Sequence, residues 1–264
     1  MGQTAWVDQT SQPAAPSSPT HAHPGAADPV ASRGRRTPLS LLQPIPADRR
    51  PRRFAQLIVG LVLYGSTMAL MVRSVLGLDP WDVFHFGIAL HVPLSLGTVI
   101  VIASVLVLLL WIPLRQRPGI GTIANALIIG VTTDAVLSLV PPTSSLWLRI
   151  PYLVIGIVGN ALAGALYIGA GLGPGPRDGL MTGIVARGIG SIRLVRTSIE
   201  VTVLVIGWVL GGTVGLGTVL YAVGIGPLLH VLLPVFRLRA PGEAPAVPAP
   251  PASRPRRLRR NRSS

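Results

Sequence analysis

Residues 76–88, Leu-Gly-Leu-Asp-Pro-Trp-Asp-Val-Phe-His-Phe-Gly-Ile, decide the fold, because residues 172–184 repeat them as Leu-Gly-Pro-Gly-Pro-Arg-Asp-Gly-Leu-Met-Thr-Gly-Ile. Both segments keep Leu-Gly, Pro, Asp and Gly-Ile at the same spacing. The shared residues are Leu76, Gly77, Pro80, Asp82, Gly87 and Ile88 in the first segment and Leu172, Gly173, Pro176, Asp178, Gly183 and Ile184 in the second. Such self-similarity at a fixed spacing predicts an internally duplicated chain.

The duplication extends on both sides of these segments. Residues 57–140 align with residues 153–236 without a gap. Apolar residues match often by chance, so the Gly, Pro, Asp and Thr matches carry the argument. Outside the two segments these include Gly119, Gly121, Thr122 and Gly130, which match Gly215, Gly217, Thr218 and Gly226. The two Gly-x-Gly-Thr motifs predict close helix packing and a capped helix start.

Long apolar segments place the duplicated region in a membrane. The chain is 49% hydrophobic with a mean hydropathy of +0.58, and a spanning helix needs about 20 apolar residues. Six segments qualify, at about 54–76, 94–112, 119–140, 151–172, 197–212 and 216–236. Two more, at about 80–92 and 176–190, begin with Pro and fall short of a span at about 1.5 Å per residue.

The predicted fold class is therefore an all-α integral membrane protein with six transmembrane helices. Repeat 1 covers about 54–140 and repeat 2 about 151–236, and each holds three spans and one short re-entrant or interfacial helix. Because three is odd, the second repeat enters the membrane from the opposite side, which gives an inverted pair. This architecture is typical of secondary transporters, but it argues for a fold more strongly than for a function.

The two ends of the chain differ from its centre. Residues 1–53 and 237–264 are rich in Pro, Ala, Ser and Arg and lack apolar periodicity, so we expect two disordered tails. Arg residues beside the spans predict that both tails are cytoplasmic, and the net charge of +14 is then explained by topology, not by nucleic-acid binding. The expected partners are the lipid bilayer and, at the basic tails, anionic lipid head groups. The first apolar run begins near Phe54, which predicts an uncleaved anchor.

The repeated segments also hold the candidate site. Asp79 is expected to cap a helix that begins at Pro80, while Asp82 and Asp178 lie in the first turns of the two short helices. Two interpretations remain open for these acids. They cap short helices, or they approach each other from opposite sides and bind a cation or proton or pair with Arg177. His85 lies three residues after Asp82, so the two share a helix face.

Three other ionisable residues lie in or beside the expected spans. Asp134 and its repeat partner His230 are candidates for a polar site in the bundle, although an interfacial, solvated carboxylate is an equal interpretation for Asp134. Glu200 follows Arg196 by four residues and is expected to form an ion pair with it. No metal site or cofactor is expected, because the chain has no Cys and no third ligand lies near Asp82 and His85.

The segments Pro80-Trp81-Asp82-Val83 with His85, Gly175-Pro176-Arg177-Asp178-Gly179-Leu180-Met181 and the Gly119–Asp134 stretch resemble the YczE/YitT group of bacterial multi-pass membrane proteins. The resemblance covers about 54–236. YitT-like members usually carry a soluble C-terminal domain, so the short basic tail of this chain is closer to the YczE branch. The resemblance implies residence in the bacterial plasma membrane and no agreed biochemical activity.

Two functions are consistent with these patterns. The first is transport of a small solute or ion through a site between the repeats. The alternative is a non-transporting accessory or scaffold protein for a biosynthetic or export system. An enzyme is not expected, because the ionisable residues supply no pair of nucleophile and base. The sequence leaves protein partners and oligomeric state open.

Overall fold

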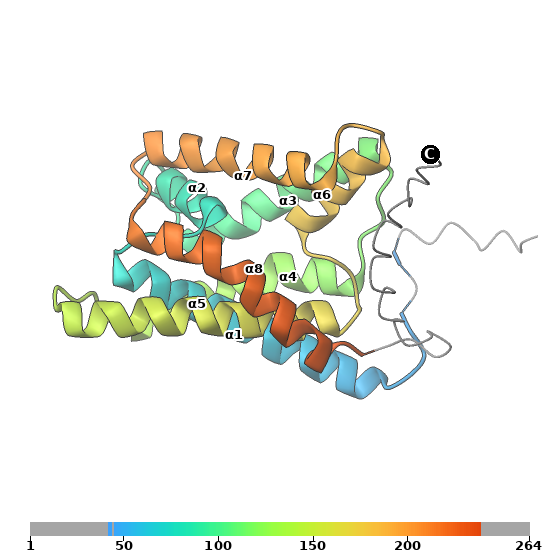
Figure 1. Ribbon diagram of the computed structural model, residues 1–264, viewed down its shortest axis with the longest axis horizontal. Helices are drawn as coiled ribbons and strands as arrows, with labels where there is room; N and C mark the ends of the chain where they lie inside the picture. Colours follow the sequence, from blue (N-terminus) through green and yellow to red (C-terminus); the bar gives the residue numbers. More distant parts are fainter. Residues whose placement is uncertain (1–41, 44, 239–264) are drawn as a thin grey trace, which may run out of the picture. The chain divides into compact units, whose positions relative to one another are not determined.

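The computed structural model describes residues 42–43 and 45–238, so most of both predicted tails, including the Arg cluster at 254–262, lies outside the described residues. The described part is helical and contains no strand (Figure 1). Its helices are α1 (Arg50–Ser74), α2 (Pro80–Ala89), α3 (Leu96–Leu114), α4 (Ile120–Leu139), α5 (Leu146–Gly169), α6 (Pro176–Ala186), α7 (Ile192–Val209) and α8 (Leu216–Phe236). The prediction of an all-α protein is confirmed.

Five of these helices, α1, α3, α4, α5 and α8, are long and apolar enough to cross a membrane. The helix at the expected fifth span is α7, which begins at Ile192, five positions before the expected start at 197. Its 18 residues include three charged side chains, those of Arg193, Arg196 and Glu200, and it is not among the five apolar helices. The structure thus supports several membrane spans by length and composition.

The short helices α2 and α6 begin at Pro80 and Pro176, as the sequence predicts. Asp79 is the N-cap of α2, and its carboxylate accepts a hydrogen bond of 2.9 Å from the backbone N–H of Asp82. The chain turns before each helix at Gly77 and Gly173, which both have a φ of +124° that favours glycine. Local sequence signals therefore determine where both helices start.

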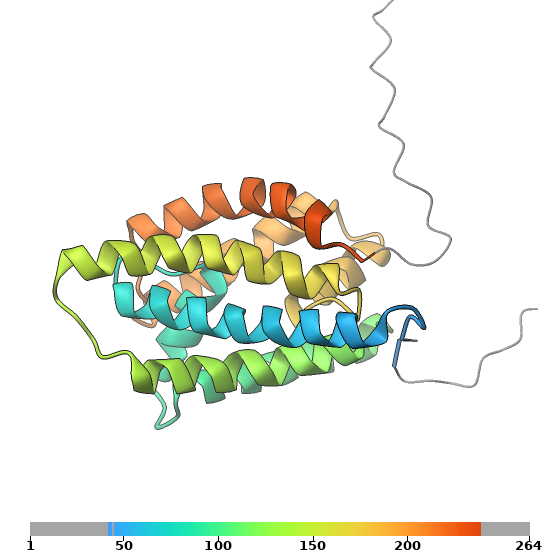
Figure 2. The same cartoon turned by 90° about the horizontal axis from the view of Figure 1, so that it is seen from below.

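The helix starts recur with the offset of the sequence repeat. The first half begins its helices at 50, 80, 96 and 120, and the second half begins its helices at 146, 176, 192 and 216. Each start in the second half lies 96 positions after its counterpart. Four helices lie side by side in the order α4, α1, α5, α8 (Figure 2), and α2, α3, α6 and α7 pack together as a second group.

Glycines bring the two halves into close contact. The backbone N–H of Gly121 donates to the carbonyl oxygen of Leu172 at 2.8 Å, and the N–H of Gly217 donates to that of Leu76 at 2.8 Å. A Cβ on Gly217 would lie 2.6 Å from the carbonyl oxygen of Gly77, so only glycine fits there. The predicted capped starts are also present, because Thr122 Oγ1 accepts from Gly119 N at 3.0 Å.

The expected boundary of the N-terminal tail at residue 53 lies too late. Helix α1 already begins at Arg50, and the side chain of Arg53 is 1% exposed. Its Nη1 donates to the carbonyl oxygen of Ala170 at 2.8 Å, and its Nη2 donates to both carboxylate oxygens of Asp48, at 3.1 and 2.9 Å. The physical reason is that the C-terminal end of α5 leaves backbone carbonyls without helical partners, and a buried Arg satisfies one of them.

Packing differs between the two ends of the bundle. Helix α3 lies along α4, and a Cβ on Gly97 would overlap the carbonyl oxygen of Gly130. The counterparts of α3 and α4 are α7 and α8, which make few contacts with each other in the described chain. Gly226 corresponds to Gly130, and a Cβ added to it would meet no atom of the described residues within 4 Å. Helices α3 and α4 therefore form a closed pair, whereas their counterparts α7 and α8 are separated.

Candidate functional site

Two adjacent cavities lie where the short helices meet α1 and α5. The first, of about 60 Å³, is lined by Asp82 and His85 from α2 and by apolar residues of α3 and α4. The second, of about 80 Å³, is lined by Asp79, Asp178 and Asn160 and extends between α7 and α8. Both cavities share the side chains of Tyr64, Trp81, Tyr167 and Arg177. Each cavity can hold roughly five water molecules or a small solute.

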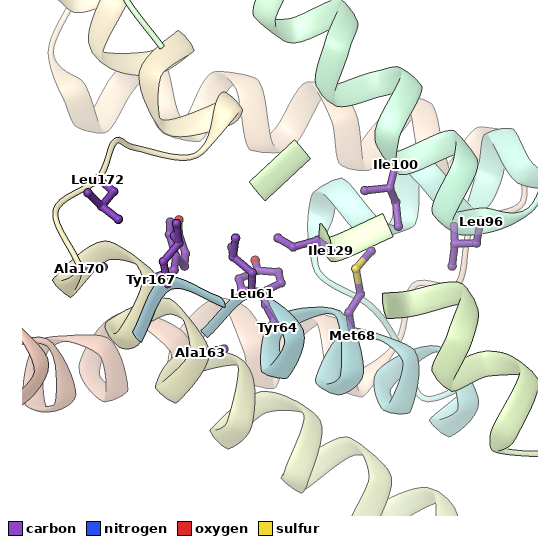
Figure 3. Close-up of a cluster of buried hydrophobic side chains, with 11 residues drawn as sticks. Leu61, Tyr64, Met68, Leu96, Ile100, Ile129, Ala163, Tyr167, Ala170 and Leu172 are labelled. Carbon is purple, nitrogen blue, oxygen red and sulfur yellow. The ribbon is translucent and has the colours of Figure 1, made fainter. Parts of the chain in front are cut away.

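The aromatic wall of the first cavity comes from the central helices. Figure 3 shows Tyr64 and Met68 of α1, Tyr167 of α5, Ile100 of α3 and Ile129 of α4, all of which line this cavity. The rings of Tyr64 and Tyr167 meet edge to face, with centroids 6.1 Å apart. Since these side chains belong to one buried cluster, packing holds the walls of the cavity in place.

Arg177 lies between the two cavities and connects the halves of the chain. Its Nη2 atom donates to the hydroxyl of Tyr64, and its guanidinium carbon lies 5.9 Å from the centroid of that ring. Its Nη1 atom lies 3.7 Å from Oδ2 of Asp79, which is 1% exposed. A cation–π contact and an ion pair thus hold the guanidinium at the border of both cavities.

Asp82 is the least compensated acid of the site. Its side chain is 4% exposed, and Oδ1 lies 3.7 Å from Nδ1 of His85. Within the described part of the chain, neither Asp82 Oδ2 nor His85 Nδ1 has a hydrogen-bond partner. Buried polar atoms in native proteins are nearly always hydrogen-bonded. These two atoms are consequently available to a ligand in the first cavity.

The second cavity has its own unpartnered polar atoms. Asn160 accepts a hydrogen bond of 3.0 Å from the hydroxyl of Tyr221, but its Nδ2 has no partner among the residues described. The same holds for Nε1 of Trp81. Asp178 differs, because it accepts a hydrogen bond of 2.9 Å from the hydroxyl of Tyr167. The cavity therefore offers an amide and an indole donor beside a fixed carboxylate.

The structure brings four of the five predicted binding residues together and places the fifth elsewhere. Asp82, His85, Arg177 and Asp178 line the two cavities, whereas Asp134 lines neither. Asp134 instead accepts hydrogen bonds from Ser95 Oγ at 2.5 Å and from the backbone N–H of Gly97 at 2.7 Å. It binds the N-terminus of α3 from across the helix pair. His230, its repeat partner, is exposed on α8.

The expected ion pair between Arg196 and Glu200 is confirmed, with Nε and Oε1 2.9 Å apart. Both side chains line the second cavity.

Sequence reasoning missed the polar residues that the spanning helices contribute. Tyr64 and Asn160 occupy equivalent positions of the two repeats. Asn125 and Tyr221 do so as well, and they line the first and the second cavity, respectively. Polar residues at the same repeat position inside apolar segments were a signal for both pairs.

Residues 51–234 match a family of unknown function, DUF6198. An uncharacterized protein of Haemophilus influenzae is 39% identical over 180 residues, which cover 68% of this chain and 83% of that protein. The uncharacterized membrane protein YczE of Bacillus subtilis is 33% identical over 177 residues, which cover 66% of this chain and 82% of YczE. The uncharacterized protein YyaS of Bacillus subtilis is 29% identical over 181 residues, which cover 67% of this chain and 90% of YyaS. No solved structure matches this chain.

Proposed function

The chain belongs to the DUF6198 family and is similar to the uncharacterized membrane protein YczE, and we propose that it transports a small solute or ion through the two central cavities. The observation that carries the proposal is the pair of cavities that meet at Arg177 and contain buried, unpartnered polar atoms. A scaffold needs no polar cavity at its centre. A solute-binding site needs one, with convergent polar groups on mostly apolar walls.

The proposal includes an inverted arrangement of the two halves, with α7 as the sixth span. Support comes from reciprocal backbone hydrogen bonds between the two halves. Gly121 of the first half bonds Leu172 of the second, and Gly217 of the second half bonds Leu76 of the first. A pseudo-twofold axis relates such reciprocal pairs, and three spans per half place this axis in the membrane plane.

Transport requires that the site open to one side of the membrane at a time. Helices α3 and α4 are joined at Asp134, Ser95 and Gly97, whereas α7 and α8 lie apart and the second cavity extends between them. In our proposal the open pair becomes closed and the closed pair opens, so that the two halves exchange conformations. The site then opens alternately to each side of the membrane, as in other inverted-repeat transporters.

The orientation of this state follows from the charged ends of the helices. Arg residues gather at the start of α1 and at the start of α7, the same side on which α7 and α8 lie apart. The positive-inside rule places this side in the cytoplasm of a bacterial cell, together with both termini. In our proposal, the second cavity therefore faces the cytoplasm in this state.

Uptake into liposomes tests the proposal. The purified full-length chain is reconstituted, and accumulation of a panel of radiolabelled ions, amines, amino acids and sugars is compared with that of empty liposomes. We expect saturable uptake of at least one compound, which Asp82→Asn and Asp178→Asn each reduce at least about tenfold because each removes a charge from a cavity wall. Thr143→Ser in the loop before α5 is the matched control and should leave uptake unchanged.

The accessory role makes a different prediction. A scaffold would co-purify with a stoichiometric protein partner and would give no uptake in liposomes. Full replacement of Asp82 and Asp178 without any change in uptake would also count against transport through these cavities.

A further inference from the structure

The charged side chains on the two cavity walls do not balance. Among the described residues that line them, Arg196 and Glu200 form a pair of their own. The remaining charged residues are three carboxylates, Asp79, Asp82 and Asp178, and one guanidinium, that of Arg177. Because an ionised carboxylate away from water needs a compensating charge, the interior of the site is short of positive charge.

The shortage is greatest at Asp82. Arg177 lies against Asp79 and Tyr64, and Asp178 accepts a hydrogen bond from Tyr167. Asp82 receives neither kind of contact from these residues. It lines the first cavity, and its Oδ2 has no hydrogen-bond partner among the residues that the structure describes. Nδ1 of His85 is likewise unpartnered, and His85 is 7% exposed. A positively charged ligand in the first cavity would supply the missing charge.

The other walls of this cavity narrow the class of cation. Most of the wall residues from α1, α3 and α4 are apolar, namely Met68, Ile100, Ala103, Val107 and Ile129. Beside Asp82 and the tyrosine hydroxyls, only the side chains of Ser104 and Asn125 add oxygen atoms to the described walls. A bare metal ion of the Ca²⁺ or Mg²⁺ kind needs six or more oxygens, at distances of about 2.0–2.6 Å. In the described chain, no three His, Asp or Glu side chains are grouped to hold a metal. A charged head group on an apolar body fits these walls better than an inorganic ion.

Aromatic rings complete the surroundings of Asp82. Trp81 and Tyr167 line the same cavity, and their π faces attract cations, with Trp the stronger of the two. The ring of Tyr64 already lies against Arg177. We infer that the first cavity binds a small organic ammonium ion, with the ammonium group at Asp82 and its apolar substituent along Ile100 and Val107. The inference rests on the proposed function, because it names the class of solute for the same site.

Isothermal titration calorimetry on the full-length chain in detergent tests the inference without transport. Ethylammonium, propionate, ethanol and sodium, all at matched ionic strength, are the probes. We expect saturable binding of ethylammonium, at least tenfold weaker binding after Asp82→Asn, and no saturable binding of the other three. Thr143→Ser, a change in the loop before α5 and outside both cavities, should keep the affinity of the parent chain.

A second variant keeps the test decisive if Asp82→Asn fails to fold. Ala103→Leu adds volume to the apolar wall and removes no charge, and it should weaken ethylammonium binding at least tenfold. Sodium binding as tightly as ethylammonium, or propionate binding in its place, would overturn the inference. So would ethylammonium binding that neither variant changes.

Liposome uptake separates this inference from the proposed function. Binding of ethylammonium in detergent with no uptake of any compound would contradict the proposed transport function and support the ammonium-binding site. Uptake of an anion or a neutral solute, with no binding of ethylammonium, would keep transport and overturn the ammonium site.

Discussion

The carboxylate of Asp134 near the end of α4 accepts a hydrogen bond of 2.7 Å from the backbone N–H of Gly97 at the start of α3. A second bond, from Ser95, anchors the other carboxylate oxygen to the same helix start. The equivalent positions of the second half hold His230 and Arg193, so no carboxylate is present there to join α8 to α7. The two helix pairs therefore differ in chemistry as well as in packing.

Removing this contact should open α3 and α4. The chain has no native cysteine, so single cysteines report access directly. Ile129, in the first cavity, and Ile225, in the second, are repeat equivalents. We expect a small hydrophilic thiol reagent to modify Ile225→Cys faster than Ile129→Cys. Asp134→Ala should raise the rate at Ile129→Cys at least about tenfold, because two hydrogen bonds to a charged group stabilise the closed pair by about 1.5 kcal/mol or more.

The rate at Ile225→Cys is the internal control for that experiment. It should stay the same or fall when Asp134 is replaced, since closing one pair accompanies opening the other. An unchanged rate at Ile129→Cys would show that Asp134 does not hold the pair closed.

Two glycine substitutions should have opposite effects on stability. Gly217→Ala places a Cβ 2.6 Å from the carbonyl oxygen of Gly77, so we expect a loss of about 1–3 kcal/mol in the free energy of unfolding. Gly224→Ala meets nothing closer than Cγ2 of Ile157 at 3.9 Å and should gain up to about 1 kcal/mol, because Ala favours a helix over Gly. Thermal unfolding in detergent measures both, and equal melting temperatures would contradict the close approach at Gly217.

Two arginines bind the helix ends of opposite halves. Arg53 donates to the carbonyl oxygen of Ala170, and its repeat equivalent Arg149 donates to that of Ser74 at 2.6 Å. Arg53 is buried and also pairs with Asp48, whereas Arg149 is partly exposed to solvent or lipid. Arg53→Ala should therefore cost about 3 kcal/mol and Arg149→Ala about 1 kcal/mol. Chemical unfolding curves compare the two, and a larger loss for Arg149→Ala would contradict this ranking.

Cysteine labelling in intact cells tests the sixth span. If α7 crosses the membrane, Thr143→Cys and Val214→Cys should react with an impermeant maleimide from outside. Gln116→Cys and Ile189→Cys should react only after the cells are permeabilised. Labelling of Ile189→Cys and Val214→Cys from the same side would show that α7 does not cross, and would remove the three-plus-three topology.

The elements that the sequence predicts well are those whose signals are local. Asp79 and Pro80 cap and start α2 through contacts within one helical turn, so its beginning could be read from the residues alone. The expected start of α7 lies too late, because Arg193 and Arg196 interrupt the apolar run while Ser191 caps the helix before them. Apolar length locates a membrane span, whereas a cap locates the start of a helix.

The candidate site could be predicted only in part, for a similar reason. Acids in the two repeated segments marked the positions of Asp82 and Asp178. The contact of Arg177 with Tyr64, however, joins residues more than a hundred positions apart, and neither composition nor spacing indicates it. The hydrogen bond from the backbone N–H of Gly97 to Asp134 was not predictable either, because the repeat equivalents of these residues cannot form the same contact.

The ion pair between Arg177 and Asp79 also bears on the evolution of the chain. Their repeat equivalents are Trp81 and Gly175, so neither half carries both partners. A symmetric dimer of the first half would contain two copies of Asp79 and no Arg177. A symmetric dimer of the second half would contain two copies of Arg177 and no Asp79. Because the two copies differ at these positions, neither copy alone can form the charged pair at the centre of the site.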